Sequence, residues 1–160
     1  MHMSADYKIR RAEAKDHDLL VEHYLALWDS YDVPREHHRP DAKSVVRGFL
    51  DEGIAELELG AFVCEHRNIA VASACCQVRN SPYPEVLQEP HRKVGYIWSV
   101  YIESDYQNQG LGSALMRSCL DHLKSINCTS VVLHSSEAGK RLYQKLGFSQ
   151  TDELSISWQD

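Results

Sequence analysis

The sequence lacks a long hydrophobic run, a Cys-x-x-Cys pair and an excess of basic residues. No apolar stretch approaches the ~18 residues that a membrane-spanning helix needs, and the amino-terminal segment MHMSADYKIR has no apolar signal-peptide core. We therefore expect no membrane partner and no secretion signal. The 17 basic and 23 acidic residues give a formal net charge of −6. This charge argues against binding to nucleic-acid phosphates and mildly favours a cationic or amine partner.

The cysteines do not form a pattern that suggests disulfides or metal binding. They are five, an odd number, at Cys64, Cys75, Cys76, Cys119 and Cys128. Side chains of neighbours such as Cys75 and Cys76 point to opposite faces of a strand, and no spacing fits a disulfide framework or a zinc site. The nine histidines are scattered, and the His37-His38 pair lacks the i, i+4 spacing of a helical metal pair. We expect reduced, mostly buried thiols, a cytoplasmic location and no metal.

The chain is long and apolar enough for a single domain over residues 1–160. Its residues are 43% hydrophobic and 25% charged, close to the averages of globular proteins. Apolar alternation and helical spacing predict these elements in chain order: a strand at 7–11, helices that begin near Asp16 and at Asp41, strands at 61–65, 69–79 and 94–102, a helix at 111–126, a strand at 130–134, a helix at 137–146 and a strand at 154–158. The last half alternates strand and helix, so the fold class is α/β or α+β, with helices on the faces of a mixed sheet.

The segment 100–112, VYIESDYQNQGLG, carries the main functional signal. A strand ends in a polar turn, after which Gly110 and Gly112 open a helix. Glycine allows a ligand to approach the backbone closely. The N–H groups of the first helical turn lack helical partners and lie at the positive end of the helix dipole. The segment therefore predicts a site for a phosphate or pyrophosphate.

The glycine spacing distinguishes this segment from two common phosphate-binding motifs. No G-x-x-x-x-G-K-[ST] occurs, and Leu115 takes the place of the third glycine of a Rossmann fingerprint. The segment resembles the GNAT N-acetyltransferase superfamily, whose signature [Q/R]-x-x-G-x-[G/A] follows a strand and is Gln107-x-x-Gly110-x-Gly112 here. A second family element, a short helix with Tyr followed by Gly-Phe, matches Tyr143 and the Gly147-Phe148 pair.

The resemblance implies a fold and a cosubstrate. The fold is a mixed, largely antiparallel central sheet of six to seven strands, flanked by about four helices, with the strands at 94–102 and 130–134 splayed apart. The cosubstrate is acetyl-CoA, its pyrophosphate held by backbone amides of 107–112 and its pantetheine arm paired with the strand at 100–102. The positions that the resemblance assigns to acetyl-CoA binding are Val100, Tyr101, Ile102, Gln107, Asn108, Gln109, Gly110, Leu111, Gly112, Ser113, Ser136, Gly139 and Tyr143.

The resemblance also implies catalytic roles. Tyr143 would donate a proton to the leaving thiolate; the alternative is that Tyr143 is a core aromatic residue. Many members place a Glu or His base 11 residues before the motif, and this position is Tyr96, whose ordinary pKa near ~10 makes it a poor base. On a strand face expected to hold Trp98 and Val100 as well, Tyr96 can line the acceptor pocket or order a water. His134 is the alternative base by position and pKa, and further candidates in the loop 80–93 are Glu85, Glu89 and His91.

These features predict an N-acetyltransferase that moves an acetyl group from acetyl-CoA to a primary amine by direct attack in a ternary complex. A small-molecule amine is favoured over a peptide N-terminus or a protein lysine, and Asp29, Asp32 and Glu36 are candidates to attract a cationic acceptor. A non-catalytic acyl-CoA-binding regulatory module is the alternative of another class, favoured by the missing Glu and the neutral sequence at 107–109. An interaction domain without a CoA site is the third reading. Dimers are common in the superfamily, which leaves a homodimer open.

Overall fold

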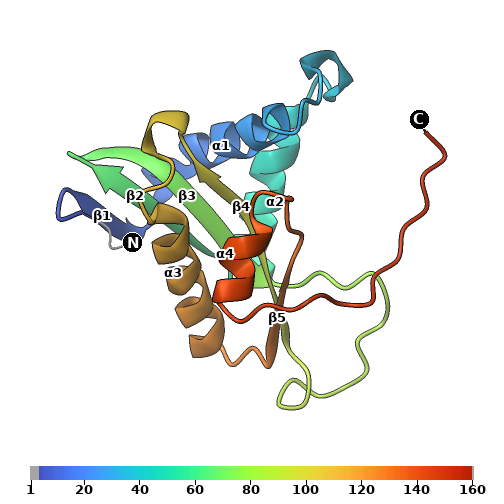
Figure 1. Cartoon of the computed structure of the whole chain (residues 1–160). Coiled ribbons are helices and arrows are strands. Elements are labelled where there is room, and N and C mark those ends of the chain that lie inside the picture. The colour runs from blue at the N-terminus through green and yellow to red at the C-terminus, as the bar shows by residue number, and fades with distance from the viewer. Residues whose placement is uncertain (1–3, 160) are drawn as a thin grey trace.

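One mixed sheet organises residues 4–159, the part of the chain that the computed structural model describes (Figure 1). Its strands lie side by side in chain order: β1 (Tyr7–Arg11), β2 (Gly60–His66), β3 (Ile69–Val78), β4 (Val94–Ile102) and β5 (Ser130–Leu133). β1 to β4 pair antiparallel, and β5 runs parallel to β4. The α-helices are α1 (His17–Asp29), α2 (Ala42–Glu56), α3 (Leu111–Ser125) and α4 (Lys140–Lys145), with 3₁₀ turns at Ala14–Asp16, Arg35–His37 and Ser104–Tyr106. The predicted α/β class, with helices on both faces of a mixed sheet, is confirmed.

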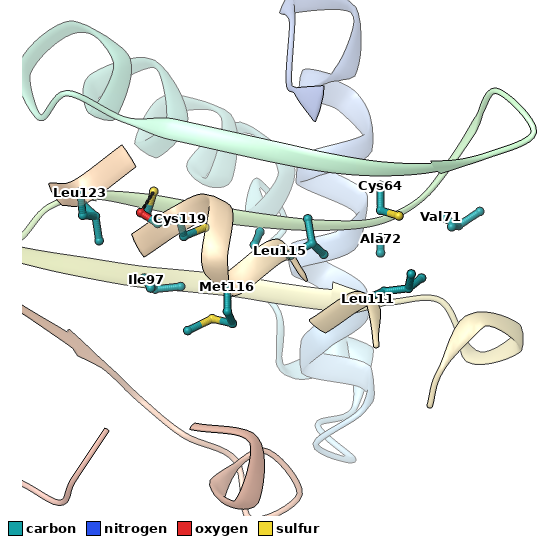
Figure 2. Close-up of a cluster of buried hydrophobic side chains, with 11 residues drawn as sticks. Cys64, Val71, Ala72, Ile97, Leu111, Leu115, Met116, Cys119 and Leu123 are labelled. Carbon is teal, nitrogen blue, oxygen red and sulfur yellow. Dashed lines mark hydrogen bonds between the residues drawn. The ribbon is translucent and has the colours of Figure 1, made fainter. Parts of the chain in front are cut away.

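Helix α3 covers one face of the sheet (Figure 2). Its apolar residues recur at three- and four-residue spacing, which puts them on one stripe of the helix. The fully buried members of this stripe are Leu111, Leu115, Met116, Cys119 and Leu123. They pack against strand residues that include Cys64, Val71 and Ile97. Burial of each leucine contributes about 1.5–3 kcal/mol, so the sheet holds the start of α3 in a defined place.

Helices α1 and α2 cover the opposite face, where they form a second core. Leu20 on α1 and Leu50 on α2 pack there with Val63 of β2. Cys75 belongs to this core, whereas its neighbour Cys76 belongs to the core under α3. The predicted alternation of these two cysteines is therefore confirmed.

The thiols serve packing in both cores. Cys64, Cys75, Cys76 and Cys119 are buried, and Cys128 is partly buried. Burial raises the pKa of the Cys64 thiol to about 11, so this thiol is neutral and unreactive at pH 7. Within residues 4–159, no group of three or more His, Cys, Asp or Glu is placed to hold a metal ion. No helix in the same range is both long and apolar enough to cross a membrane.

Strand β4 and the edge strand β5 separate part of the way along. Their parallel pairing runs from Val94 and Ser130 to Ile97 and Leu133. Beyond Ile97, the edge of β4 that faces β5 has no strand partner within the described chain, while its other edge continues to pair with β3. This pattern agrees with the expected splay and leaves backbone hydrogen-bonding groups of β4 available to a ligand.

A β-bulge at Ser99 changes which way the side chains of β4 point. Ser99 has a φ of 56°, and the register with β3 shifts between Ser73 and Cys75. Trp98 therefore packs with the α1/α2 core, while Val100 packs with the α3 core. The prediction that Trp98 and Val100 share a face was wrong, because a bulge adds a residue and reverses the alternation after it.

The predicted strand at 154–158 is also wrong in this structure. The segment runs as an extended tail away from the sheet (Figure 1), and its apolar residues Leu154, Ile156 and Trp158 are 93%, 72% and 87% exposed. Alternation marks a segment that can become a strand, but the hydrogen bonds of a strand come from a neighbour, and β5 does not pair with this tail. The sheet formed by residues 4–159 thus has five strands and not six to seven.

A buried histidine of α1, His23, contacts the sheet at Ser73 of β3 and at Glu103, the residue that follows β4. It is 3% exposed. Its Nδ1 lies 2.7 Å from Ser73 Oγ, and its Nε2 lies 3.6 Å from a carboxylate oxygen of Glu103. Burial lowers the pKa of His23, and Glu103 opposes part of that effect. The folded protein therefore takes up a proton here less readily than the unfolded chain does.

We expect the free energy of unfolding to fall as the pH drops from 7.5 to 5. A histidine in the unfolded chain has a pKa of ~6.5. Below that pH the unfolded state binds a proton that folded His23 does not bind, so the free energy of unfolding falls by up to about 1.4 kcal/mol per pH unit. Urea unfolding at four pH values measures this slope. His23→Gln should reduce the slope, and an unchanged slope in that variant would contradict the assignment to His23.

Candidate functional site

The splay between β4 and β5 opens into a cavity of about 110 Å³. Four segments form its walls: the end of α1, β4 around Ser99, the end of β5, and α4 with the turn before it. The cavity brings together four residues that the sequence singled out, Val100, His134, Ser136 and Tyr143. Side chains from distant parts of the chain thus converge where β4 loses its partner.

The N-terminus of α3 presents backbone N–H groups beside β4. Gly110 is the N-cap residue, with a φ of 80°, and Asn108 has a φ of 61°. No side chain caps this helix end, and its first turn has no acidic residue. The N–H groups of Leu111 to Ser113 precede the first helical hydrogen bond, from Ala114 N to Gly110 O. They therefore present unpaired donors and the positive end of the dipole, the chemistry that suits a pyrophosphate.

Two glutamine side chains stabilise the loop that leads into α3. Gln107 Nε2 donates to the carbonyl oxygen of Ile102 at 3.4 Å. The Tyr7 hydroxyl of β1 donates to Gln109 Oε1. Both side chains are therefore engaged in contacts within the fold. The hydrogen-bond donors that remain for a ligand at the start of α3 are the backbone amides. The sequence contained no signal for Tyr7, because its contact spans 102 residues.

Gly112 permits close packing of α3. A Cβ atom at this position would lie 3.2 Å from Leu142 Cδ2 and 3.4 Å from Ile102 Cδ1. The glycine therefore lets α3 approach both β4 and α4. Its role differs from that of Gly110, whose positive φ disfavours other residues.

Tyr143 lies on α4 with its ring packed over Gly139. An added Cβ at Gly139 would lie 2.8 Å from Tyr143 Cε2, and the Phe148 ring meets the Tyr143 ring at a centroid distance of 6.0 Å. Burial, with a smaller effect from Tyr31, raises the pKa of Tyr143 above its ordinary value. The phenol therefore keeps its proton at neutral pH and can act as an acid.

We expect Gly139→Ala to lower kcat about tenfold or more, because the new methyl group must displace the Tyr143 ring, and small displacements of a catalytic group are costly. The Kd for acetyl-CoA should change little. Steady-state kinetics and calorimetry measure the two quantities. Gly48→Ala is the matched control, since a Cβ at Gly48 meets nothing within 4 Å. Unchanged kcat in Gly139→Ala would contradict this view of the ring.

The base candidates occupy different places. Tyr96 is not among the residues that line the cavity; it lies opposite Val132, in the part of β4 that pairs with β5. Burial, with smaller effects of Glu153 and Tyr24, raises the pKa of Tyr96, which makes it still less suited to accept a proton. His134 is exposed and lines the cavity. Of these two candidates, only His134 lines the cavity.

The loop 80–93 contributes no residue to the cavity lining. Glu85 pairs with Arg79 at 2.8 Å, and Glu89 lies 3.8 Å from Lys93 Nζ. His91 is exposed. On the linker after α1, Asp29 pairs with Arg35 at 2.5 Å, which neutralises one of the acids considered for a cationic acceptor.

Residues that the sequence analysis did not single out complete the cavity. Leu27, Ser30 and Tyr31 come from the end of α1, and Ser99 comes from the bulge. In the sequence, Leu27 and Tyr31 follow Leu20 and Tyr24 at helical spacing, which is typical of a face buried in a core. The cluster of aromatic residues at the end of that helix is the one sequence feature that could have indicated a cavity. The local sequence, however, does not distinguish residues that line a cavity from residues buried in a core.

Solved structures of similar fold include acetyltransferases. One, a predicted acetyltransferase from Clostridium acetobutylicum, was determined with acetyl-CoA. It is 24% identical to this chain, the match covers 94% of this chain and 96% of the other, and the TM-score is 0.78. The glucosamine-6-phosphate N-acetyltransferase of Arabidopsis thaliana is 22% identical, with coverage of 96% and 99% and a TM-score of 0.68. These likenesses establish the fold.

Curated relatives match over shorter segments. The glucosamine 6-phosphate N-acetyltransferase of Trypanosoma brucei brucei is 40% identical over 57 residues, 36% of this chain and 39% of the relative. The mycothiol acetyltransferase of Paenarthrobacter aurescens (strain TC1) is 37% identical over 68 residues, 41% of this chain and 21% of the relative. The match therefore spans about two-fifths or less of these relatives' length.

The motifs at 107–112 and 143–148 lie inside a longer region of family likeness. Sequence patterns of the acetyltransferase (GNAT) family match residues 20–148, which include α2, α3 and α4, strands β2 to β5 and most of α1. Because this match extends over most of the chain, the protein belongs to the acetyltransferase (GNAT) family.

Proposed function

We propose that the protein transfers the acetyl group of acetyl-CoA to the primary amine of a small molecule, in a ternary complex and without a covalent enzyme intermediate. The observation that carries this proposal is the loss of pairing between β4 and β5 after Ile97, beside a cavity lined by Tyr143. The free edge of β4 and the uncapped start of α3 both adjoin this region of the sheet.

The chain offers separate binding groups for the parts of acetyl-CoA. The first-turn amides of α3 suit the pyrophosphate. The unpaired edge of β4 after Ile97 suits the amide groups of the pantetheine arm, which would add to the sheet like a strand. The family relationship and the acetyl-CoA in the related structure from Clostridium acetobutylicum support this cosubstrate. An activated thioester is the chemistry that acetyl-CoA supplies.

In the reaction, the neutral amine attacks the thioester carbonyl carbon, so that a C–N bond forms and the C–S bond breaks. Tyr143 donates its phenolic proton to the departing thiolate. The proton lost by the amine passes to His134 or to water, and Tyr143 regains a proton from solvent. The buried thiols, with the raised pKa of Cys64 as an example, do not suit the role of an acyl carrier.

A small acceptor is favoured by two observations. The cavity is about 110 Å³, well below the roughly 300–1,000 Å³ of pockets for drug-sized ligands. The curated relatives are named for glucosamine 6-phosphate and mycothiol rather than for proteins.

Acetylation of a panel of small amines and peptides tests the proposal, with release of free thiol and product mass as readouts. We expect turnover on at least one small amine and weaker turnover on peptides. Acetyl-CoA binding by calorimetry without turnover on any amine would favour the regulatory module instead. Unchanged thermal stability in millimolar CoA would contradict the binding site itself, because a ligand at ~100 times its Kd adds about 2.7 kcal/mol.

A further inference from the structure

Five aromatic residues form a connected wall beside the cavity: Tyr24, Trp28 and the nearby Tyr31, with Phe49 of α2 and Trp98 of β4. Their rings make edge-to-face contacts, at centroid distances of 5.7 Å for Tyr24 and Trp98, 5.9 Å for Trp28 and Tyr31, and 5.0 Å for Phe49 and Trp98. Tyr31 and Trp98 also line the cavity. The aromatic wall is therefore continuous with the space where the reaction is proposed to occur.

Much of this aromatic wall is open to solvent. Trp28, Tyr31 and Phe49 are 41%, 45% and 42% exposed, although large aromatic side chains are among the strongest contributors to cores and interfaces. An exposed apolar surface next to a cavity is typical of a ligand-binding groove. The wall provides the rings of Trp28 and Tyr31 as contacts for a ligand whose amine enters the cavity.

The cavity contains no permanently charged side chain that would hold an anion. Among residues 4–159, those that line it include no Lys, Arg, Asp or Glu; the polar side chains are His134 and hydroxyl groups such as those of Ser30 and Ser136. On the nearby linker and the start of α2, the cations face carboxylates: Arg35 pairs with Asp29, Arg39 with Asp41 and Lys43 with Glu22. A phosphate or carboxylate would be desolvated here without a charged partner, which is unfavourable.

The wall also favours an aromatic acceptor over a polyamine. A second ammonium group gains little from cation–π contact with solvent-exposed rings, and it lacks a carboxylate among the cavity-lining residues in the described chain. An aromatic ring gains from apolar burial as well as from edge-to-face contact with Trp28 and Tyr31. The small cavity admits a slender alkylamine arm and leaves the ring outside it.

Building on the proposed function, we infer that the acceptor is an arylalkylamine without an anionic group, with its ring against Trp28 and Tyr31 and its amine in the cavity. The reaction is the acetyl transfer described above, with the same C–N bond formed and the same C–S bond broken. Trp28 and Tyr31 then determine acceptor specificity and take no part in the chemistry.

The experiment compares kcat/KM for 2-phenylethylamine, spermidine and glucosamine 6-phosphate at saturating acetyl-CoA. We expect 2-phenylethylamine to be preferred at least about tenfold over the other two, because aromatic contacts of this kind change affinity by roughly two- to tenfold per ring pair. Trp28→Ala and Tyr31→Ala should each raise its KM several-fold, with kcat and the Kd for acetyl-CoA little changed. Tyr31→Phe keeps the ring, so its KM for 2-phenylethylamine should equal that of the wild-type protein.

Ile69→Ala is the matched control, since Ile69 is 67% exposed at the start of β3 and is not part of the aromatic wall or the cavity lining. Circular dichroism verifies that each variant is folded. Higher kcat/KM for spermidine or glucosamine 6-phosphate, or an unchanged KM in Trp28→Ala and Tyr31→Ala, would overturn the inference and leave the proposed acetyl transfer intact. Binding of acetyl-CoA with no thiol release for any of the three amines or for the wider panel would overturn both.

Discussion

Tyr143→Phe should lower kcat by about 100-fold or more, since a positioned general acid typically contributes 10²–10⁴-fold. The substitution removes only the hydroxyl group. The ring keeps its packing against Phe148 and Gly139, so the Kd for acetyl-CoA should stay within about twofold of the wild-type value. Steady-state kinetics with a saturating amine and calorimetry with acetyl-CoA measure the two effects separately.

The pH profile provides a second test of Tyr143. Because burial raises its pKa, Tyr143 remains protonated throughout the neutral range. Loss of activity through its ionisation should begin only above the ordinary tyrosine pKa of ~10.

Tyr83→Phe is a suitable control for Tyr143→Phe, because Tyr83 lies in the loop 80–93 and does not line the cavity. Equal losses of kcat and acetyl-CoA affinity in Tyr143→Phe would show that Tyr143 has a structural role.

Gly112→Val should weaken acetyl-CoA binding at least about tenfold, with a loss of about 1–3 kcal/mol in unfolding free energy from overpacking. A Cβ alone would lie 3.2 Å from Leu142 Cδ2 and 3.4 Å from Ile102 Cδ1, so the larger valine must push the start of α3 away from β4 and α4. The expected cause is therefore displacement of the amides by packing, and not a side chain placed over them. Calorimetry with acetyl-CoA and urea unfolding measure the two losses.

A double variant distinguishes the two causes. Adding Leu142→Ala to Gly112→Val removes the closest contact and should recover part of the lost affinity if displacement is responsible. No recovery would favour direct obstruction of the amides. Unchanged affinity in Gly112→Val itself would mean that the start of α3 does not bind acetyl-CoA.

The sequence was most informative where a pattern is local. The β-branched and aromatic residues predicted β4 with its observed bounds, Val94–Ile102, and the apolar stripe on α3 predicted its buried face. The glycine motif likewise located the uncapped helix end at Gly110. Each of these features depends on residues within a few positions of one another, through the strand period of two or the helical period of 3.6.

Features that need a distant partner were missed or predicted wrongly. The alternation at 154–158 indicated a strand, yet no neighbouring strand pairs with it in the described chain. The bulge at Ser99 depends on the register with β3, and it reversed the predicted facing of Val100. Trp28 and Tyr31 follow Tyr24 at helical spacing, which is typical of a buried face, but both rings are partly exposed, and Tyr31 lines the cavity.

Local periodicity and the glycine motif were thus enough to predict the order of the elements from β1 to α4, the α/β class and the uncapped helix end at Gly110. The cavity, the gap in pairing between β4 and β5, and the surroundings of Tyr143 depended on contacts between residues far apart in the chain. The physical reason is that the strand and helix periods relate only residues a few positions apart in the sequence. The ends of α1, β5 and α4, by contrast, meet only after long-range packing has placed all three around β4.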